Sequence, residues 1–255
     1  MDEKQIQEAM KKEATIVLGI PGVWKDRAAI VDAITEKGGG YTYGGMLLTH
    51  PNTKKSFGLE IYEHDPKLKE AFEYAGMGRF SIEELNQLDK HTFILYVIGE
   101  AGNTGLAQNI MEVASALLDA GGLGVKVETA GKAFNIEQWK TLTSLDDPAR
   151  FYDAFVTKLQ VQDDVFYTCG MHNLGLKDAI VGAVGLEAAS HTLDVFSIFQ
   201  IVEQPEMHPG EWFAVNDELP KFQLLAEKDT RYPEDDGFFN RHGLWILRPG
   251  IDFEE

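Results

Sequence analysis

Two side chains that could bind a metal or attack a substrate lie close together in the second half of the chain. Cys169, the only cysteine, and His172 form a C-x-x-H pair. A structural zinc site needs two more Cys or His ligands at similar spacing, and the other histidines are scattered, with no H-E-x-x-H motif. Cys169 also lies within an apolar strand pattern, where a lone cysteine behaves as a small core residue. We therefore expect neither a metal site nor a catalytic residue, although Cys169 paired with a distant histidine could form a nucleophile.

Two glycine-rich loops could line a ligand pocket. Gly99–Gly105 reads G-E-A-G-N-T-G between an expected strand and an expected helix, a position where free backbone N–H groups attract anions. The loop lacks the Lys-Ser/Thr pair of a P-loop and the spacing of G-x-G-x-x-G, and Glu100 would repel a phosphate. We therefore expect a structural loop and no cofactor. In the second loop, Gly170–Gly175, the glycines predict an internal turn packed under a helix or the close approach of another chain.

The strongest signal in the sequence is negative charge, which is concentrated in the last third of the chain. The net charge is −18, with 41 acidic and 23 basic residues, and residues 161–255 hold 18 acidic and 6 basic residues. Such a field repels nucleic acid and anionic membranes, and it speeds the encounter with a basic partner. The simpler interpretation, which stays open, is that the acidity keeps the protein in solution.

Aromatic residues accompany this charge, and protein interfaces combine charged rims with aromatic anchors. We therefore predict a partner-binding surface made of Trp212, Phe213, Tyr232, Glu234, Asp235, Asp236, Phe238 and Trp245. The favoured hypothesis is a non-catalytic protein that docks on a basic protein, for example an immunity-type inhibitor that covers the active site of a cationic toxin. The alternatives are an enzyme or small-ligand-binding protein with a pocket near Gly99–Gly105 or Gly170–Gly175, and a scaffold that self-associates.

The elements that must position these residues follow a repeated order in the first part of the chain. Hydrophobic periodicity predicts strand 15–20, helix 26–37, strands 45–49 and 57–63, helices 65–74 and 82–88, strand 91–98, helix 106–118 and strand 125–127. Asp65-Pro66 predicts the start of one helix, and Ser81 with Glu84 predicts a capping box at the start of the next. Strand, helix and strand thus occur twice, which predicts two β-α-β-like (ferredoxin-like) units within residues 1–160.

The rest of the chain predicts a second region, residues 161–255, with its own short strands. The expected elements around and within it are a helix after Asn135, a helix after Pro148 with apolar residues up to Leu159, strand 161–169, helix 186–202 and strands 212–215, 222–226 and 244–247. Asp229–Gly237, with four acidic residues and one arginine, is expected to be an exposed loop. Together the two regions predict an α+β fold.

Three stretches carry a resemblance to a known family. They are the strand and helix HTFILYVI…LAQNIMEVASALLDAGGLGV from His91, the segment FYDAFVTKLQV from Phe151, and CGMHNLGLKD from Cys169 with the helix after it. On these stretches, over roughly residues 15–200, the chain resembles the bacterial domain-of-unknown-function family numbered 4261. The resemblance implies an α+β fold and brings no catalytic residues. The acidic, aromatic segment Pro205–Arg248 departs from the short ending of the family.

The composition excludes several classes of protein. Hydrophobic residues make up 44% of the chain, as in globular proteins, and no apolar run approaches the roughly 20 residues that span a bilayer. The first 14 residues are charged throughout, without the apolar stretch of a secretory signal. A single cysteine permits no intrachain disulfide. We therefore expect a cytoplasmic protein with no membrane partner.

Overall fold

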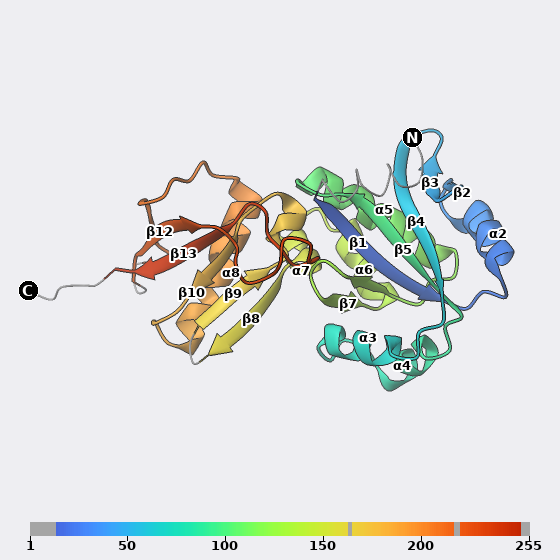
Figure 1. Cartoon of the computed structure of the whole chain (residues 1–255), viewed down its shortest axis with the longest axis horizontal. Helices are drawn as coiled ribbons and strands as arrows, with labels where there is room; N and C mark the ends of the chain where they lie inside the picture. Colours follow the sequence, from blue (N-terminus) through green and yellow to red (C-terminus); the bar gives the residue numbers. More distant parts are fainter. Residues whose placement is uncertain (1–13, 163–164, 217–219, 251–255) are drawn as a thin grey trace, which may run out of the picture. The chain divides into compact units, whose positions relative to one another are not determined.

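The computed structural model describes residues 14–162, 165–216 and 220–250. The chain has a mixed α+β fold, as predicted, and divides into two compact units (Figure 1). The first unit comprises Met1–Ala101 and Gly105–Asp146, and the second comprises Gly102–Thr104 and Asp147–Glu255. The division falls before residue 147 and not after residue 160, because the helix and strand that follow Asp147 pack into the second unit.

The first unit is built on a seven-stranded sheet in which every neighbouring pair is antiparallel. In the order β2-β3-β4-β5-β1-β6-β7, its strands are β2 (Thr42–Gly44), β3 (Leu47–His50), β4 (Lys55–Glu63), β5 (Phe93–Glu100), β1 (Thr15–Gly22), β6 (Val125–Val127) and β7 (Lys132–Phe134). The sequence did not predict β2 or β7, which are three residues long. Their pairing with neighbouring strands holds them in place where local propensity is weak.

Helices lie between these strands in the chain, and one follows the last strand. They are α2 (Arg27–Lys37), α3 (Leu68–Gly76), α4 (Ile82–Leu88), α5 (Thr104–Asp119) and α6 (Ile136–Ser144). The predicted capping box of α4 is confirmed, with the Glu84 backbone N–H donating to Ser81 Oγ and the Ser81 N–H donating to the Glu84 carboxylate. Helix α3 begins at Leu68, later than predicted. Asp65 accepts a hydrogen bond from the Lys67 N–H in the turn before it.

The strand order explains the repeated strand–helix–strand pattern. Strands β1 and β4 run in the same direction with β5 between them, and β5 and β6 run in the same direction with β1 between them. Helix α2 lies between β1 and β4 in the chain, and α5 lies between β5 and β6. The finer assignment to ferredoxin-like units stays a prediction.

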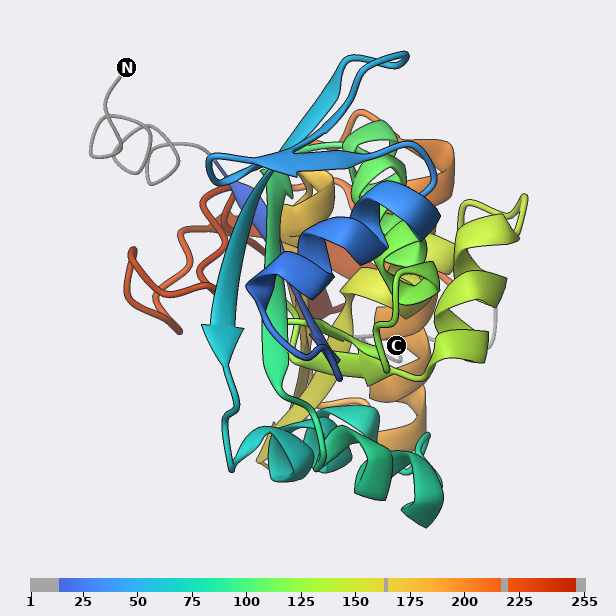
Figure 2. The ribbon, with the colours of Figure 1, turned by 90° about the vertical axis from the view of Figure 1, so that its right-hand side faces the viewer.

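The two faces of the first sheet have different surroundings. Alternate side chains of β1 and β5, such as Leu18 and Val97, are completely buried, and on this face Gly99 lies close to Ile110 of α5. Figure 2 shows α2 (dark blue) and α5 (green) on the same side of strands β4 and β5. On the opposite face, α3 and α4 bury Ile94 beneath Phe72 and their other apolar residues. Val17 and Ile98, further along that face, are half-buried.

The second unit contains a six-stranded sheet covered by a long helix. In the order β11-β12-β13-β10-β9-β8, the strands are β11 (Trp212–Phe213), β12 (Phe222–Glu227), β13 (Leu244–Pro249), β10 (Asp178–Val181), β9 (Val165–Cys169) and β8 (Thr157–Gln162). The other elements are α7 (Arg150–Phe155), the 3-10 helix η1 (Met171–Leu174) and α8 (Leu186–Glu203). Leu193 and Phe196 of α8 are fully buried in a core with strand residues such as Phe222 and Leu224.

The prediction of a single strand over residues 161–169 was wrong. Strands β8 and β9 form an antiparallel hairpin in which Thr157 lies opposite Cys169, and the helix expected to reach residue 159 ends at Phe155. Leu159 fits both the helical spacing that follows Phe155 and Val156 and the strand alternation with Val161, so periodicity alone could not separate the two.

Candidate functional site

Cys169 and His172, the pair with the most reactive side chains in the sequence, lie inside the second unit. Both are buried. Burial, followed by the nearby Asp178 carboxylate, raises the pKa of the Cys169 thiol to about 12, so the thiol stays protonated at neutral pH and is a poor nucleophile. The described residues contain no group of three or more His, Cys, Asp and Glu side chains that could hold a metal ion.

His172 is unusual because a buried imidazole normally finds hydrogen-bond partners. Within the described part of the chain neither of its ring nitrogens makes a hydrogen bond, although the Gly237 backbone lies near the ring. Burial, the neighbouring His242 and the Arg231 charge lower the pKa of His172 to about 4. The ring is therefore neutral at physiological pH.

A half-buried arginine, Arg231, organises the long loop between β12 and β13. The Arg231 guanidinium donates to Asp178 at 2.8 Å and to Asp229 at 2.9 and 3.0 Å, and its third donor reaches the Thr168 carbonyl at 2.7 Å. Both carboxylates are completely buried. Asn240 closes the base of the loop, donating its backbone N–H to Asp229 and its side-chain amide to the Leu176 carbonyl. We call Arg231, Asp178, Asp229 and Asn240 the Arg231 cluster.

The charged groups of the Arg231 cluster are hydrogen-bonded to one another. Burial raises the pKa of Asp229, but the hydrogen bonds from Arg231 and Asn240 outweigh burial and hold that pKa below its usual value. At Asp178, which lies deeper, burial outweighs Arg231 and the pKa is raised. Burial also opposes the charge of Arg231, but the two carboxylates raise its pKa above the usual value. The cluster holds the loop on the sheet, with both carboxylates bound to the one guanidinium inside the fold.

The three consecutive acidic residues of the predicted binding surface lie at the far end of this loop. Glu234, Asp235 and Asp236 are exposed, and we call them the acidic tip. Behind them the Phe238 N–H donates to an Asp236 carboxylate oxygen at 2.8 Å, and the Tyr232 and Phe238 rings pack with their centroids 5.6 Å apart. The acidic tip is thus carried by a loop whose base is fixed by the Arg231 cluster.

Of the predicted aromatic anchors, Tyr232 and Phe238 lie beside the acidic tip in the same loop, whereas Trp212, Phe213 and Trp245 do not. Trp245 is buried in the core of the second unit, so its assignment to a partner-binding surface was wrong. Phe213 packs its ring 4.9 Å from that of Phe196, and Tyr232 shares a hydrogen bond with Tyr167. Trp212 is 57% exposed, but it pairs with Gln223 near the start of β12, whereas the loop of the acidic tip follows the other end of that strand. Charge and aromatic content in the sequence did not predict which rings face the solvent.

The two glycine loops meet in one cavity of about 220 Å³ in the second unit. Gly102 donates its backbone N–H to the Asn173 carbonyl. Gly175 adopts φ +75°, and a Cβ there would lie 2.2 Å from the Gly102 carbonyl oxygen, so only glycine permits this approach. Residues 171–174 between the flanking glycines are buried, as expected for an internal turn.

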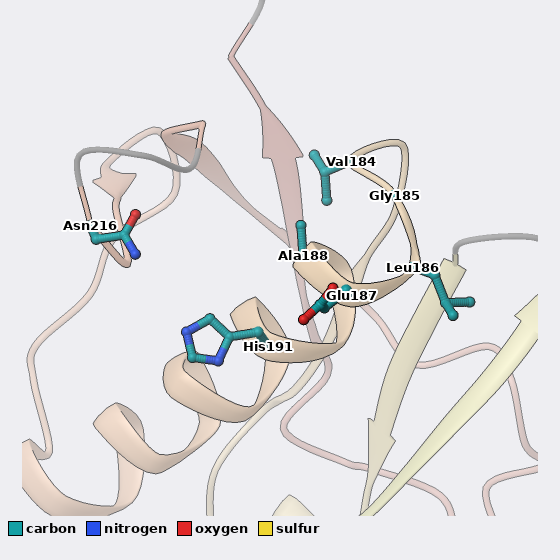
Figure 3. A pocket seen from close by; sticks show the side chains of 7 residues that line it. All are labelled: Val184, Gly185, Leu186, Glu187, Ala188, His191 and Asn216. Atoms are coloured by element: carbon teal, nitrogen blue, oxygen red, sulfur yellow. The ribbon is translucent and has the colours of Figure 1, made fainter.

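A larger cavity of the second unit, about 680 Å³, lies at the start of α8 (Figure 3). Its polar side chains are Glu187 and His191, one turn apart on α8, and Asn216 from the segment after β11. Figure 3 shows the His191 ring and the Asn216 amide on opposite sides of the opening. One carboxylate, one imidazole and one amide form neither a metal site nor a catalytic pair with an oriented base.

Comparisons with known proteins give no relative from which to transfer a site: no family model, no curated protein and no solved structure matches the chain. Within the described residues, no helix combines the length and the apolar character needed to cross a membrane.

Sequence reasoning missed the Arg231 cluster, although one signal was available. Asp178 interrupts the apolar strand pattern around Ile180 and Val181, and a carboxylate within a buried strand needs a paired cation. What the sequence could not show is that the cation is Arg231, which lies 53 positions away in a loop that reads as exposed.

Proposed function

We propose that this chain is a non-catalytic protein that binds a basic protein partner through the acidic tip, as an immunity-type inhibitor of a cationic toxin would. One observation carries the proposal: three adjacent exposed carboxylates stand on a loop whose base is held by the Arg231 cluster. The resemblance to family 4261, itself still a prediction, is compatible with this function and adds no site residue to it.

The physical argument rests on pre-organisation and charge. Ordering a loop on binding costs free energy for each immobilised side chain, and the hydrogen bonds of Arg231 to Asp178 and Asp229 already fix the base of this loop. The net charge of −18 attracts a basic protein from a distance of about one Debye length, and the acidic tip then provides close contacts. Such a surface favours fast, salt-sensitive association.

The test is capture of partners by the full-length chain from a lysate at low and at high salt, compared with the variant Glu234→Gln/Asp235→Asn/Asp236→Asn. Asparagine at 236 keeps the oxygen that accepts the Phe238 N–H, so the loop should keep its conformation. We expect a basic protein that is captured at low salt, lost at high salt and depleted by the variant.

The matched control is Asp32→Asn/Glu36→Gln/Glu73→Gln, which removes the same charge from exposed positions on α2 and α3 of the first unit. This control should capture the partner as well as the original chain does. Capture that is insensitive both to salt and to the acidic tip variant would reject the proposal. Equal loss with both triple variants would mean that net charge alone matters.

A second candidate function is favoured by the cavity between the glycine loops. The sequence left a ligand pocket near Gly99–Gly105 or Gly170–Gly175 open as an alternative. Gly102 and Gly175 both line the cavity of about 220 Å³ together with the polar side chains of Thr104 and Gln204. That volume suits a small molecule. Ligands that bind only the folded state raise the melting temperature, so a screen of nucleotides and small metabolites tests this function. A shift that Thr104→Val abolishes would support it, because Thr104 lines the cavity, and a screen without any shift would count against it.

A further inference from the structure

The first unit carries an open groove that the proposed function does not use. The groove, of about 450 Å³, lies on the face of the first sheet opposite α5, over strands β1, β4 and β5. Its floor is apolar, formed by Val17, Ile94 and Ile98, and two tyrosines, Tyr62 and Tyr96, stand above that floor. We call it the tyrosine groove.

Strand alternation and register bring these residues together. Glu60 and Tyr62 are two positions apart on β4 and therefore point to the same face, and they lie opposite Tyr96 and Ile94 of β5. Gly19 of β1 lies opposite Tyr96 on the other side, and a Cβ on Gly19 would lie 3.2 Å from the Tyr96 ring. The missing side chain of Gly19 leaves the space in which the Tyr96 ring lies across β1.

The two tyrosine rings form a fixed aromatic corner. Their centroids are 5.4 Å apart and their planes are nearly perpendicular, at 86°. The Tyr62 hydroxyl donates to a Glu60 carboxylate oxygen at 2.9 Å, which holds the ring upright while 53% of the residue stays exposed. A large aromatic ring that is both held in place and open to solvent is available for contact with a partner.

The rim of the groove is negative. Three carboxylates line it, from Glu60, Glu63 and Asp65, and the residues that line it, all within the described part of the chain, include no Lys, Arg or His. Burial and the charges of Glu128 and Asp65 raise the pKa of Tyr96 to about 12, and the hydrogen bond to Glu60 raises that of Tyr62. Both phenols therefore stay neutral, and their electron-rich faces add to the negative potential.

Two other charged residues close to the groove neutralise each other. Lys126 of β6 lies opposite Gly19 in the register and pairs with Glu128, whose carboxylate approaches the Gly19 backbone. Because Lys126 is paired with Glu128, it does not offset the negative charges of Glu60, Glu63 and Asp65.

We propose that the tyrosine groove binds a lysine or arginine side chain from an extended segment of a basic protein. The apolar floor fits the aliphatic stem of such a side chain, the Tyr62 and Tyr96 faces attract its cation, and Glu60 and Glu63 accept its hydrogen bonds. The groove is open along the sheet face, which suits a side chain on a polypeptide better than a small molecule that must be enclosed. The site lies in the first unit and does not depend on the acidic tip.

The test uses the full-length chain and capped peptides of alternating glycine and arginine, with citrulline replacing arginine in the control peptide. We expect the arginine peptide to shift the NMR resonances of the Tyr62 and Tyr96 rings saturably, and the neutral citrulline peptide to leave them unchanged. Tyr62→Ala should weaken binding about two- to fivefold, as expected for an exposed cation–π contact, whereas Tyr62→Phe should retain most of the affinity. Glu60→Gln/Glu63→Gln should weaken binding and reduce its dependence on salt.

Matched variants separate this site from general electrostatic attraction. Tyr74, 85% exposed on α3, and the exposed Glu70 and Glu73 beside it lie outside the groove, so Tyr74→Ala and Glu70→Gln/Glu73→Gln should bind the peptide normally. Equal weakening by these controls, or equal binding of the citrulline peptide, would overturn the proposal.

The acidic tip variant should also leave the tyrosine shifts intact, which makes the two proposals independent. If Lys4→Gln/Lys11→Gln/Lys12→Gln raises the peptide affinity, the N-terminus of the chain competes for the groove and the assigned occupant is wrong. If Tyr62→Ala dissociates a dimer in sedimentation without any peptide effect, the occupant is a second copy of the chain, and the proposal also fails.

Discussion

The Arg231 cluster and the tyrosine groove use the same residue types in opposite ways. In the cluster, the carboxylates of Asp178 and Asp229 are completely buried and shared by one guanidinium. In the groove, Glu60 and Glu63 are partly or fully exposed and no cation lines the cavity. Buried charges must be paired within the fold because desolvation is costly, whereas exposed charges remain solvated and free to meet a partner. Burial therefore indicates which acidic residues stabilise the fold and which can bind.

The same comparison extends to the acidic tip. Glu234–Asp236 and the cluster residues Asp229, Arg231 and Asn240 occupy one loop between β12 and β13. Arg231 ties the base of this loop to Asp178 of β10, and the exposed carboxylates stand at its end. An acidic loop with a fixed base presents its outer carboxylates in a defined direction. Substitutions in the Arg231 cluster should thus lower the stability, whereas substitutions in the acidic tip should affect binding alone.

The largest loss in the free energy of unfolding should come from Arg231→Met. This change leaves Asp178 and Asp229 buried without a cation, which typically costs about 3–5 kcal/mol. Urea denaturation of the variant and the original chain measures the loss in the free energy of unfolding.

Arg248→Met is the matched control, because Arg248 is exposed on β13 and surface changes usually cost less than about 0.5 kcal/mol. A loss for Arg231→Met no larger than for Arg248→Met would show that the cluster does not hold the second unit together.

An intermediate loss of stability against unfolding should appear as the pH falls. The pKa of His172 lies at about 4 in the folded protein and at 6.5 in a free side chain, so the unfolded state binds more protons below about pH 6.5. The stability that neutral His172 provides is complete above that pH and is lost as the pH falls toward 4, by about 2 kcal/mol at pH 5. Denaturation midpoints at neutral and acidic pH measure this loss.

His172→Gln should remove that part of the pH dependence, because glutamine does not titrate. His242 and Arg231 disfavour a charge on the His172 ring, and Asp229 favours it. The difference between the pH curves of the two chains therefore gives the contribution of His172 to the free energy of unfolding. Parallel pH curves for the original chain and His172→Gln would contradict the assignment of a neutral, buried imidazole.

The smallest effect on stability is expected in the groove. Glu60→Gln/Glu63→Gln removes two charges that no cation in the lining offsets, so the free energy of unfolding should stay within about 0.5 kcal/mol of the original value. Thermal and urea unfolding measure it. A loss of several kcal/mol would mean that these carboxylates are structural, and the contrast with the Arg231 cluster would disappear.

Local signals in the sequence predicted much of the fold. Ser81 is confirmed as the N-cap of α4, and the helix predicted from Asp26 to Lys37 is confirmed as α2. The strands that become β1 and β5 were predicted from apolar runs bounded by glycine or charge. The prediction failed where two local patterns coincide, as at Val156–Leu159, and where strands are too short to have a pattern, as in β7. In both places, pairing with a neighbouring strand determines the structure.

The candidate sites depend on contacts between distant residues and could be predicted only in part. The exposure of Glu234–Asp236 follows from local composition. The burial of Trp245 depends on a core completed by α8, and the tyrosine groove depends on pairing of β4 with β5, more than 30 positions apart. A single sequence holds no direct record of these pairings, so Tyr62 and Tyr96 were not among the predicted site residues.

The most direct measurement of the central claim is the dissociation constant of the captured basic partner for the original chain and the acidic tip variant across a series of salt concentrations. The account predicts that the original chain binds about tenfold more tightly at low salt, since three exposed charges each contribute about 0.5 kcal/mol, and that its affinity falls more steeply as salt is added. Equal affinities with parallel salt dependence would contradict it.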